Sequence, residues 1–398
     1  MRVALRLARR GYGLSSPNPM VGAVLVKSGK IIGRGWHRRA GLPHAEIEAI
    51  RDALKRNHHP KGATLYVTLE PCCTHGRTPP CTDAIIAAGI RRVVAGTRDP
   101  NPKHSGRGFA ILRGAGIEVE LPGVPRLRGK RSLSRPTVPR GGAELQTVAS
   151  ECARLNEAFN HWIVHHTPFV TVKAAMTLDG KIATASGESK WITGEKARAG
   201  GMKLRQGADA ILVGINTILA DDPSLTARVK GRNPGNIQHR MPRRIVLDSM
   251  ARTPLDAKVV NDGHAALTTI VVSRTAPKTR VAALAKRVNV IVAPAMASLS
   301  PVTRHPSPLN LRWLMRKLGA ESVTRLLVEG GGEVNASFLL GGFAQRVAFF
   351  YAPKILGGRD ARKAVAGEGA KSLAEVIQLG DVAWQRLGPD WLLTAQVG

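Results

Sequence analysis

The chain has 398 residues, with 59 Lys or Arg against 28 Asp or Glu, and its formal net charge is +31. The 43% hydrophobic content supports packed cores, and the length exceeds what one core usually fills, so two or three domains are expected. This composition excludes a disordered or collagen-like chain, and no apolar run is long enough to cross a membrane or resembles a signal peptide. We therefore expect a cytoplasmic protein.

The positive charge is compatible with two kinds of partner. A basic surface binds nucleic acid by releasing counterions, but it also suits phosphorylated small molecules. Aromatic residues make up only 4% of the chain, and no segment interleaves Arg or Lys with Phe or Tyr as a single-strand binding surface would. Phosphorylated small molecules are therefore the expected partners, and nucleic acid is the less supported alternative.

Helices and strands alternate along residues 1–121. The pattern predicts a short amphipathic helix over 2–10 and a hairpin of strands 20–26 and 30–36. Further helices are predicted over 44–56, 81–89 and 108–114, with strands over 64–69, 92–95 and 117–121. This order predicts an α/β domain with a three-layer α/β/α arrangement.

Residues 122–144 are rich in proline and arginine and are expected to form a linker. A solvated tether and an anion-binding arm both fit this composition. A second α/β domain is predicted over 145–398, beginning with a helix over 145–160. Its predicted strands are 169–175, 210–213, 244–247, 268–272, 289–292, 325–328 and 346–352, and its predicted helices include 195–205, 310–318 and 333–340. Residues 231–240 are predicted to be a loop insertion.

The first domain contains a candidate metal site. His44 opens a predicted helix, Cys72 follows a predicted strand, and Cys81 opens the next helix. One imidazole and two thiolates, with a fourth position left open, are typical of catalytic zinc. Glu46, two residues from His44, is placed to move a proton between water and a leaving amine, as in zinc nucleobase deaminases.

Simpler interpretations exist for each of these residues. A His-x-Glu pair is often on the surface, and cysteines are often buried as small apolar residues. Cys73 competes with Cys72 as the ligand, and the Pro-Cys register favours Cys72. Cys152 is expected to be an ordinary buried thiol. The ordered combination favours the deaminase interpretation.

Four motifs of the first domain carry a family resemblance. They are PNPMVGAV at 17–24, HAE at 44–46, GRTPPC at 76–81, and DPNP at 99–102 followed by GRG at 106–108. In these the chain resembles the bifunctional riboflavin-biosynthesis deaminase/reductases. The resemblance implies a cytidine-deaminase-like fold, with zinc held by His44, Cys72 and Cys81 and with Glu46 as the proton carrier. The implied substrate-pocket residues are Asn18, His37, Arg77, Asp99 and Asn101.

One position departs from that family's pattern. Thr74 stands where a histidine is expected, and His75 is the candidate to compensate for it. The resemblance implies no role for the basic linker, which is longer than the short join expected between the two halves.

The second domain contains Glu329 followed by a triple glycine, between a predicted strand and a predicted helix. Such a run is either a flexible turn or a loop whose helix amides approach a phosphate. The ordered set of motifs over 145–398 resembles the reductase half of the same family, which implies a dihydrofolate-reductase-like α/β fold and NADPH as cofactor. The implied NADPH contacts are Ala175, Trp191, Thr217, Asp221, Ser249, Gly331, Gly332, Glu333, Val334, Asn335, Ala336 and Ser337.

The resemblance also implies a set of substrate contacts in this domain. They are Ser189, Leu225, Glu329, Arg205 and Arg228, with Lys173 and Asp179 as further ribose-handling candidates. Guanidinium groups match phosphate oxygens, so Arg205 and Arg228 are expected to clamp the substrate phosphate. For Lys173 and Asp179 an ordinary salt bridge at a strand end is the alternative. Residues 201–203 replace a stretch in which the family commonly has a histidine.

The resemblance of both halves implies a two-step enzyme with Zn²⁺ and NADPH. It would deaminate 2,5-diamino-6-(5-phosphoribosylamino)pyrimidin-4(3H)-one and then reduce the ribosyl group of 5-amino-6-(5-phosphoribosylamino)uracil to ribityl. The alternatives are a nucleic-acid base deaminase and a basic zinc-containing nucleic-acid-binding protein without activity. Neither alternative needs the loop 329–332 or the run 221–228. A homo-oligomer is expected.

Overall fold

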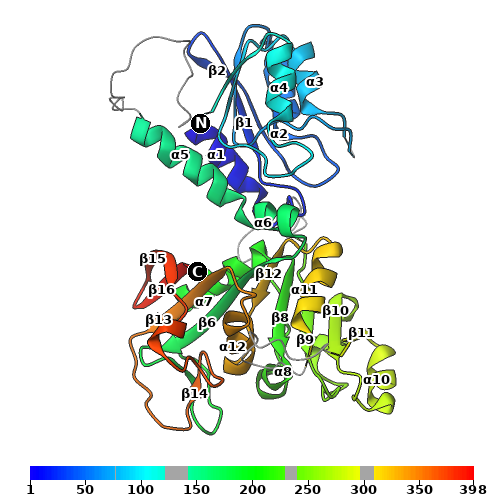
Figure 1. Cartoon of the computed structure of the whole chain (residues 1–398), viewed down its shortest axis with the longest axis vertical. Coiled ribbons are helices and arrows are strands. Elements are labelled where there is room, and N and C mark those ends of the chain that lie inside the picture. Colours follow the sequence, from blue (N-terminus) through cyan, green and yellow to red (C-terminus); the bar gives the residue numbers. More distant parts are fainter. Residues whose placement is uncertain (77, 122–141, 229–239, 296–308) are drawn as a thin grey trace. The chain divides into compact units, whose positions relative to one another are not determined.

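A computed structural model describes residues 1–76, 78–121, 142–228, 240–295 and 309–398, with side chains of the helix that begins at residue 142 described from Val148 onward. Arg77 and nearly all of the expected linker and loop insertion lie outside the described residues. The chain divides into two units, Met1–His166 and Thr167–Gly398 (Figure 1). Among the described helices, none combines the length and the apolar character that a membrane span requires.

The first unit is built on a five-stranded sheet in the order β2-β1-β3-β4-β5. Strand β1 is antiparallel to β2 and β3, whereas β3, β4 and β5 are parallel. The strands are β1 Gly22–Lys27, β2 Lys30–Trp36, β3 Thr64–Val67, β4 Arg92–Ala95 and β5 Glu118–Glu120. The helices are α1 Arg2–Ala8, η1 Arg9–Gly11, α2 Ala45–Lys55, α3 Cys81–Ala87 and α4 Arg107–Gly114.

Two hydrophobic clusters enclose this sheet. Buried residues of α2, α3 and α4 pack on one face, and residues of α1 pack against Val24 on the other. The expected three-layer α/β/α arrangement is confirmed, and the elements predicted over residues 1–121 all form.

Helix α2 lies unusually close to β2 because two glycines face it. A Cβ on Gly33 would lie 2.2 Å from the Ala49 carbonyl oxygen, and one on Gly35 would lie 2.1 Å from the Ala45 carbonyl oxygen. No side chain fits in that space, so glycine is required at both positions. The close approach fixes the first turn of α2, which carries Glu46.

The helical segment after the linker differs from the expectation. It consists of two helices, α5 Gly142–Leu155 and α6 Glu157–His165, and both group with the first unit. Asn156 separates them, and its side chain accepts from the Met20 amide at 2.8 Å and donates to the Met20 carbonyl at 3.0 Å. Cys152 also packs against Leu5 of α1. These contacts with the first unit explain why the boundary falls at residue 166 and not near 145.

The second unit is built on a nine-stranded sheet in the order β11-β10-β9-β8-β12-β6-β13-β16-β15. The strands from β11 to β13 in this order are parallel, while β16 and β15 run antiparallel at the end. The strands are β6 Phe169–Thr177, β8 Ala210–Gly214, β9 Arg243–Leu247, β10 Thr268–Val272, β11 Asn289–Val292, β12 Arg325–Val328, β13 Arg346–Ala352, β15 Leu379–Leu387 and β16 Asp390–Val397. A separate small ladder joins β7 Lys181–Ala183 to β14 Arg362–Lys363.

Helices cover both faces of the parallel part of this sheet. Alternate residues of β8 point to opposite cores, with Leu212 in the cluster that holds α11 and α12 and Ile211 in the cluster that holds α8 and α9. The helices are α7 Glu195–Gly207, α8 Ile215–Asp221, α9 Lys258–Asn261, η2 Ala265–Leu267, α10 Lys278–Ala285, α11 Leu311–Ala320, α12 Gly332–Leu340 and η3 Leu373–Glu375. All seven predicted strands of this unit form.

Candidate functional site

The first site lies where α2, α3 and the end of β3 meet. The Nδ1 atom of His44 lies 3.4 Å from Cys72 Sγ and 3.3 Å from Cys81 Sγ. The three donor atoms all lie within 4.8 Å of one another. One imidazole nitrogen and two sulfurs at this spacing fit a tetrahedral zinc ion with bonds of roughly 2.0–2.3 Å. His44, Cys72 and Cys81 therefore form a group that could hold a zinc ion.

Local structure explains how the sulfurs are presented. Cys81 is the first residue of α3, and its amide donates to Cys72 Sγ at 3.3 Å. A hydrogen bond from the Cys81 thiol lowers the pKa of Cys72 to about 4, because it stabilises the thiolate that a metal ion requires. A thiolate at this place is therefore available at neutral pH.

Glu46 is the buried acid of the site. It lies in the first turn of α2, two residues from His44, and is only 3% exposed. Burial raises the pKa of Glu46 to about 7, because the charged form loses its hydration. A carboxyl group with that pKa can both take up and release a proton near neutral pH.

Two expected pocket residues adjoin the zinc ligands. The His37 ring lies edge-on to the His44 ring, with 5.0 Å between centroids, and His37 Nε2 is 3.1 Å from Asn18 Nδ2. Burial lowers the pKa of His37 to about 4, so its ring is neutral at pH 7. The other ring nitrogen, Nδ1, lies 3.2 Å from the Pro43 carbonyl oxygen, so both nitrogens of the neutral ring are engaged and the ring holds the Asn18 amide in place.

The loop after β4 is held by a carboxylate that the sequence did not single out. Glu70 is buried three residues after the end of β3 and accepts from the amides of Asp99, Gly106 and Gly108 at 3.2, 2.9 and 3.1 Å. Because β3 and β4 are parallel, their following loops lie at the same sheet edge. Asp99 and Asn101 are thus carried on the same edge as Cys72.

The structure places a histidine, His104, close to the segment in which Thr74 departs from the family pattern. Thr74 is half-buried, and His75, expected to compensate, is exposed. His104, from the loop after β4, lies with Nδ1 3.5 Å from Cys73 Sγ. Sequence reasoning missed His104, because two separate loops bring it to Cys73.

In the second unit the expected cofactor residues gather at one edge of the sheet. Thr217 follows β8, Ser249 follows β9, and the run from Gly331 follows β12. These strands are parallel, so their carboxyl ends share the edge at which doubly wound sheets usually bind ligands. Gly331 leaves the space beside its Cα open, and α12 begins there with its free amides. The arrangement fits a dinucleotide.

Trp191 and Asp221, two further expected NADPH contacts, do not directly follow one of these strands. The Trp191 ring is 65% exposed and carries the Arg198 guanidinium 4.7 Å from its centroid. Asp221, at the end of α8, lies 3.5 Å from Lys190 Nζ and accepts weakly from Ser189 at 3.4 Å. Ser189 is thereby placed beside Asp221.

Three expected substrate residues form a partly buried ionic cluster. Arg205 donates from Nε and Nη2 to the two oxygens of Glu329, at 2.9 and 2.7 Å, and Lys173 Nζ lies 3.8 Å from Glu329 Oε2. Burial alone would raise the pKa of Glu329, but the positive charges of Lys173 and Arg205 lower it to about 2. Arg205 Nη1 also donates to the Thr226 carbonyl at 3.3 Å, so all three nitrogens of the Arg205 guanidinium bind protein.

The other substrate candidates lie in loops. Leu225 is 2% exposed, and Arg228 is exposed, with its Nη2 3.4 Å from Ser224 Oγ. Asp179 accepts from Thr177 Oγ1 at 2.6 Å and from the Gly357 amide at 2.8 Å. The Thr177 hydrogen bond is the main reason why the pKa of Asp179 is lowered to about 2.

The fold and the two sites define a class, a zinc-dependent deaminase domain joined to a dihydrofolate-reductase-like reductase domain. The family model of the cytidine and deoxycytidylate deaminase zinc-binding region matches residues 1–97, and that of the RibD C-terminal domain matches residues 168–393. The chain belongs to the RibD family, bifunctional deaminases and reductases of riboflavin biosynthesis that use zinc and NADPH.

Full-length relatives and solved structures agree with this assignment. The riboflavin biosynthesis proteins RibD of Aquifex aeolicus and Escherichia coli are 40% and 38% identical, over 99% and 98% of this chain and 96% of theirs. RibD of Acinetobacter baumannii superposes with a TM-score of 0.77 at 32% identity. A deaminase/reductase of Thermotoga maritima does so with a TM-score of 0.75 at 34% identity. Each of these two structures covers 100% of this chain and is itself covered to 97%.

Proposed function

We propose that this chain deaminates 2,5-diamino-6-(5-phosphoribosylamino)pyrimidin-4(3H)-one and then reduces the ribosyl group of 5-amino-6-(5-phosphoribosylamino)uracil. The observation that carries the proposal is the buried Glu46 carboxyl beside the His44, Cys72 and Cys81 cluster, in one chain with an NADPH-type reductase domain. The Thermotoga maritima relative is described as acting on these two compounds.

In the deaminase half, zinc bound by His44, Cys72 and Cys81 would supply Lewis-acid activation of water. Glu46 takes a proton from the attacking water and delivers it to the leaving amine, a task matched by its pKa of about 7. Asn18, held by the neutral His37 ring, orients the pyrimidine. Asp99 and Asn101 contact the pyrimidine or its ribose from the loop that Glu70 holds. Arg77, which lies outside the described residues, is proposed as a further contact.

In the reductase half, NADPH would supply the hydride. We place it along the sheet edge formed by Ala175, Thr217, Ser249 and the first turn of α12, with Trp191 and Asp221 at the side. Glu329 holds Lys173 in place toward the substrate ribose. Arg205 is engaged by Glu329, so we assign the phosphate to Arg228, whose guanidinium is exposed. Ser189, Leu225 and Asp179 complete the proposed substrate contacts, with Leu225 acting through its main chain because its side chain is buried.

One coupled assay tests the pair of reactions. The purified protein, with zinc measured beforehand, is given the diaminopyrimidine substrate, and ammonia and NADPH are followed together. We expect ammonia to appear first and NADPH to fall after it. Absence of both signals from a zinc-loaded protein would contradict the proposal. Deamination of single-stranded DNA or tRNA, or steeply salt-dependent polynucleotide binding, would favour the nucleic-acid alternatives.

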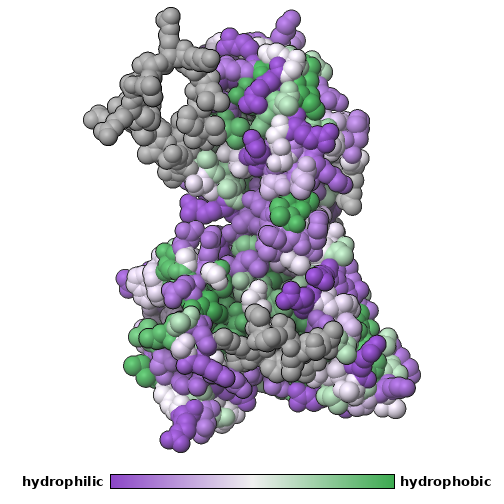
Figure 2. All heavy atoms as spheres, in the orientation of Figure 1, coloured by the Kyte–Doolittle hydropathy of each residue, from purple (hydrophilic) through white to green (hydrophobic). Residues whose placement is uncertain are grey.

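We also propose that the chain forms a homodimer through strand β15. This strand lies at the end of the nine-stranded sheet and exposes Val382 and Trp384 by 51% and 57%. Figure 2 shows apolar residues at the surface on the side where Figure 1 places β15 and β16. An exposed apolar edge strand pairs readily with a second copy. Sedimentation of Trp384→Lys as a monomer would support this interface, and an unchanged mass would exclude it.

The cytoplasm is the proposed location. Cys72 and Cys81 have to remain reduced to bind a metal ion, and reduced thiols persist in a reducing compartment. Cofractionation of the protein with cytoplasmic markers is the corresponding measurement.

A further inference from the structure

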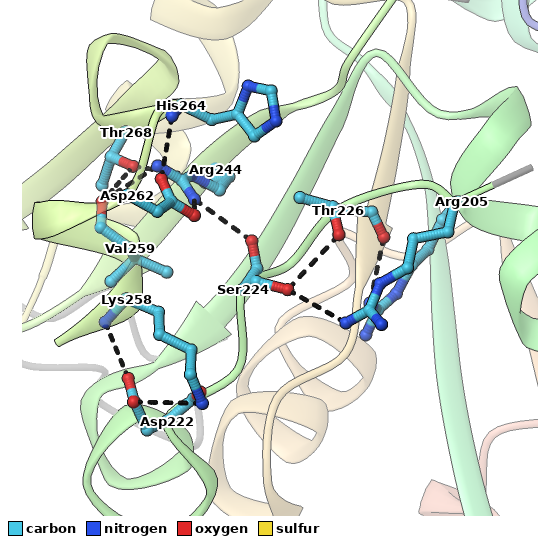
Figure 3. A network of polar contacts seen from close by, with 11 residues as sticks. Arg205, Asp222, Ser224, Thr226, Arg244, Lys258, Val259, Asp262, His264 and Thr268 are labelled. Carbon is cyan, nitrogen blue, oxygen red and sulfur yellow. Dashed lines mark hydrogen bonds and ion pairs between the residues drawn. The ribbon is translucent and has the colours of Figure 1, made fainter. Parts of the chain in front are cut away.

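The segment Asp222–Arg228, which we name the anchored loop, is held by its carbonyl groups. Every second carbonyl oxygen accepts a hydrogen bond from a side chain of another element. The pairs are Asp222 with Lys258 Nζ at 3.1 Å, Ser224 with Arg244 Nη1 at 3.1 Å, Thr226 with Arg205 Nη1 at 3.3 Å, and Arg228 with Gln206 Nε2 at 3.2 Å. Figure 3 shows the region around the first three of these contacts. Alternate carbonyl oxygens are also bonded in a β-strand at the edge of a sheet, but here the donors are side chains of α9, β9 and α7 and not the main chain of a neighbouring strand.

The side chains of the loop strengthen this attachment. Leu225 and Ala227 are 2% and 4% exposed, and Leu225 packs in the core cluster of α8 and α9. Leu225 also has a positive φ of 47°, a backbone conformation that a residue of this size adopts only when its surroundings impose it. The carbonyl anchors and the buried side chains together fix the path of the main chain.

Arg244 is the most deeply buried of the anchors, with 1% of its surface exposed. Besides the Ser224 carbonyl, it donates to Thr268 Oγ1 at 2.8 Å, to Asp262 Oδ2 at 2.7 Å and to the Val259 carbonyl at 3.1 Å. A buried charge is costly unless all its hydrogen bonds are made. These bonds hold the guanidinium rigidly and leave one of its nitrogens directed at Ser224.

We propose that Arg244 is a positioning residue of the reductase, which fixes the Ser224 main chain and thereby presents Leu225 and Arg228 to the phosphorylated substrate. The inference rests on the proposed function, because it takes Leu225 and Arg228 as substrate contacts. Arg244 itself does not contact the substrate in this proposal and acts only through the anchored loop.

The test compares two adjacent arginines on β9. Arg244→Lys keeps the charge beside Asp262 but offers one nitrogen in place of three, so it loses some of the four acceptors. Arg243→Lys is the matched control, because Arg243 pairs with Glu321 at 2.7 Å. In Arg244→Lys we expect the KM of the ribosyl substrate to rise by about tenfold and the KM of NADPH to change by less than about twofold. Arg243→Lys and the deaminase activity should be unaffected.

Hydrogen exchange provides a readout independent of activity. Amides of residues 222 and 224–228 should exchange about tenfold faster in Arg244→Lys, with β9 and β10 unchanged. Faster exchange throughout the second unit, or an unchanged loop and substrate KM, would overturn the proposal. If Arg244→Lys does not fold, Lys258→Met tests the neighbouring anchor at an exposed position. We then expect an increase in substrate KM of about threefold, and no change would count against the proposal. If the wild-type protein does not reduce the substrate, the proposed function fails, while the exchange data still decide whether Arg244 anchors the loop.

Discussion

Arg205 and Glu329 form a two-pronged ion pair inside the second unit, with Nε–Oε1 and Nη2–Oε2 distances of 2.9 and 2.7 Å. The pair joins α7 to the end of β12, and Lys173 of β6 adds a second positive charge. One buried carboxylate therefore faces two cations from different elements. Its ionisation is linked to the stability of the reductase unit.

This linkage predicts acid sensitivity. The pKa of Glu329 is about 2 in the folded protein, below its ordinary value of 4.5, so the folded state favours the charged form. The stabilisation is fully present above about pH 4.5 and is lost as the pH falls toward 2, by about 3 kcal/mol. In calorimetry, the unfolding transition that NADPH shifts belongs to the reductase unit. In Glu329→Gln this unit should have a lower unfolding free energy at neutral pH, and that free energy should depend less on pH. The exposed Glu368→Gln should behave as wild type; identical profiles for all three proteins would refute the linkage.

Glu46→Gln separates metal binding from proton transfer. The amide cannot exchange a proton, so we expect ammonia release to fall by about 10²–10⁴-fold or more. Zinc content and the reduction of already deaminated substrate should stay unchanged. Glu48→Gln, on the same helix and paired with exposed Arg38 and Arg51, is the control. A fully active Glu46→Gln protein would rule out the assigned role.

Serine substitutions distinguish the two adjacent cysteines. Cys72 Sγ lies beside His44 and Cys81, whereas Cys73 Sγ lies beside His104. We expect Cys72→Ser to lose bound zinc and deaminase activity and Cys73→Ser to retain both. Elemental analysis of the purified variants gives the answer directly. Loss of zinc from Cys73→Ser alone would reassign the ligand.

Gly35→Ala tests the close contact between β2 and α2. The new methyl group would lie 2.1 Å from the Ala45 carbonyl oxygen, so the start of α2 has to move. We expect the first unit to lose about 2 kcal/mol or more of unfolding free energy, together with deaminase activity. Gly114→Ala, where nothing lies within 4 Å of the added carbon, should be neutral. Equal stability of the two variants would show that the contact is unimportant.

Periodicity and motif order predict most of this fold because buried strands and amphipathic helices leave a local signal. The parallel strands β8, β9 and β10 are short apolar runs, and the structure places them as expected. The C-terminal hairpin escaped prediction because every residue of β15 from Leu379 to Arg386 is exposed, so the strand lacks alternation between buried and exposed positions. The small ladder of β7 and β14 is too short to leave a pattern.

The candidate sites show the same limit. The grouping of His44, Cys72 and Cys81 was predictable because each lies near a helix or strand boundary and belongs to a distinctive motif. The contacts of Glu70, His104 and Arg244 join segments far apart in the sequence, and no local pattern encodes them. The ion pair of Arg205 with Glu329 likewise joins residues that are 124 positions apart in the sequence.

The hydrogen bonds between Asn156 and Met20 bear on how the two activities could be separated. A gene fragment that stops at the end of the first sheet, near residue 121, omits the amide side chain that pairs with the main chain ahead of β1. It also omits Cys152, which fills the space against Gly96 and Leu5. The boundary between the two units lies after His166. A deaminase domain expressed alone should therefore keep α5 and α6, and a reductase domain expressed alone should begin after them.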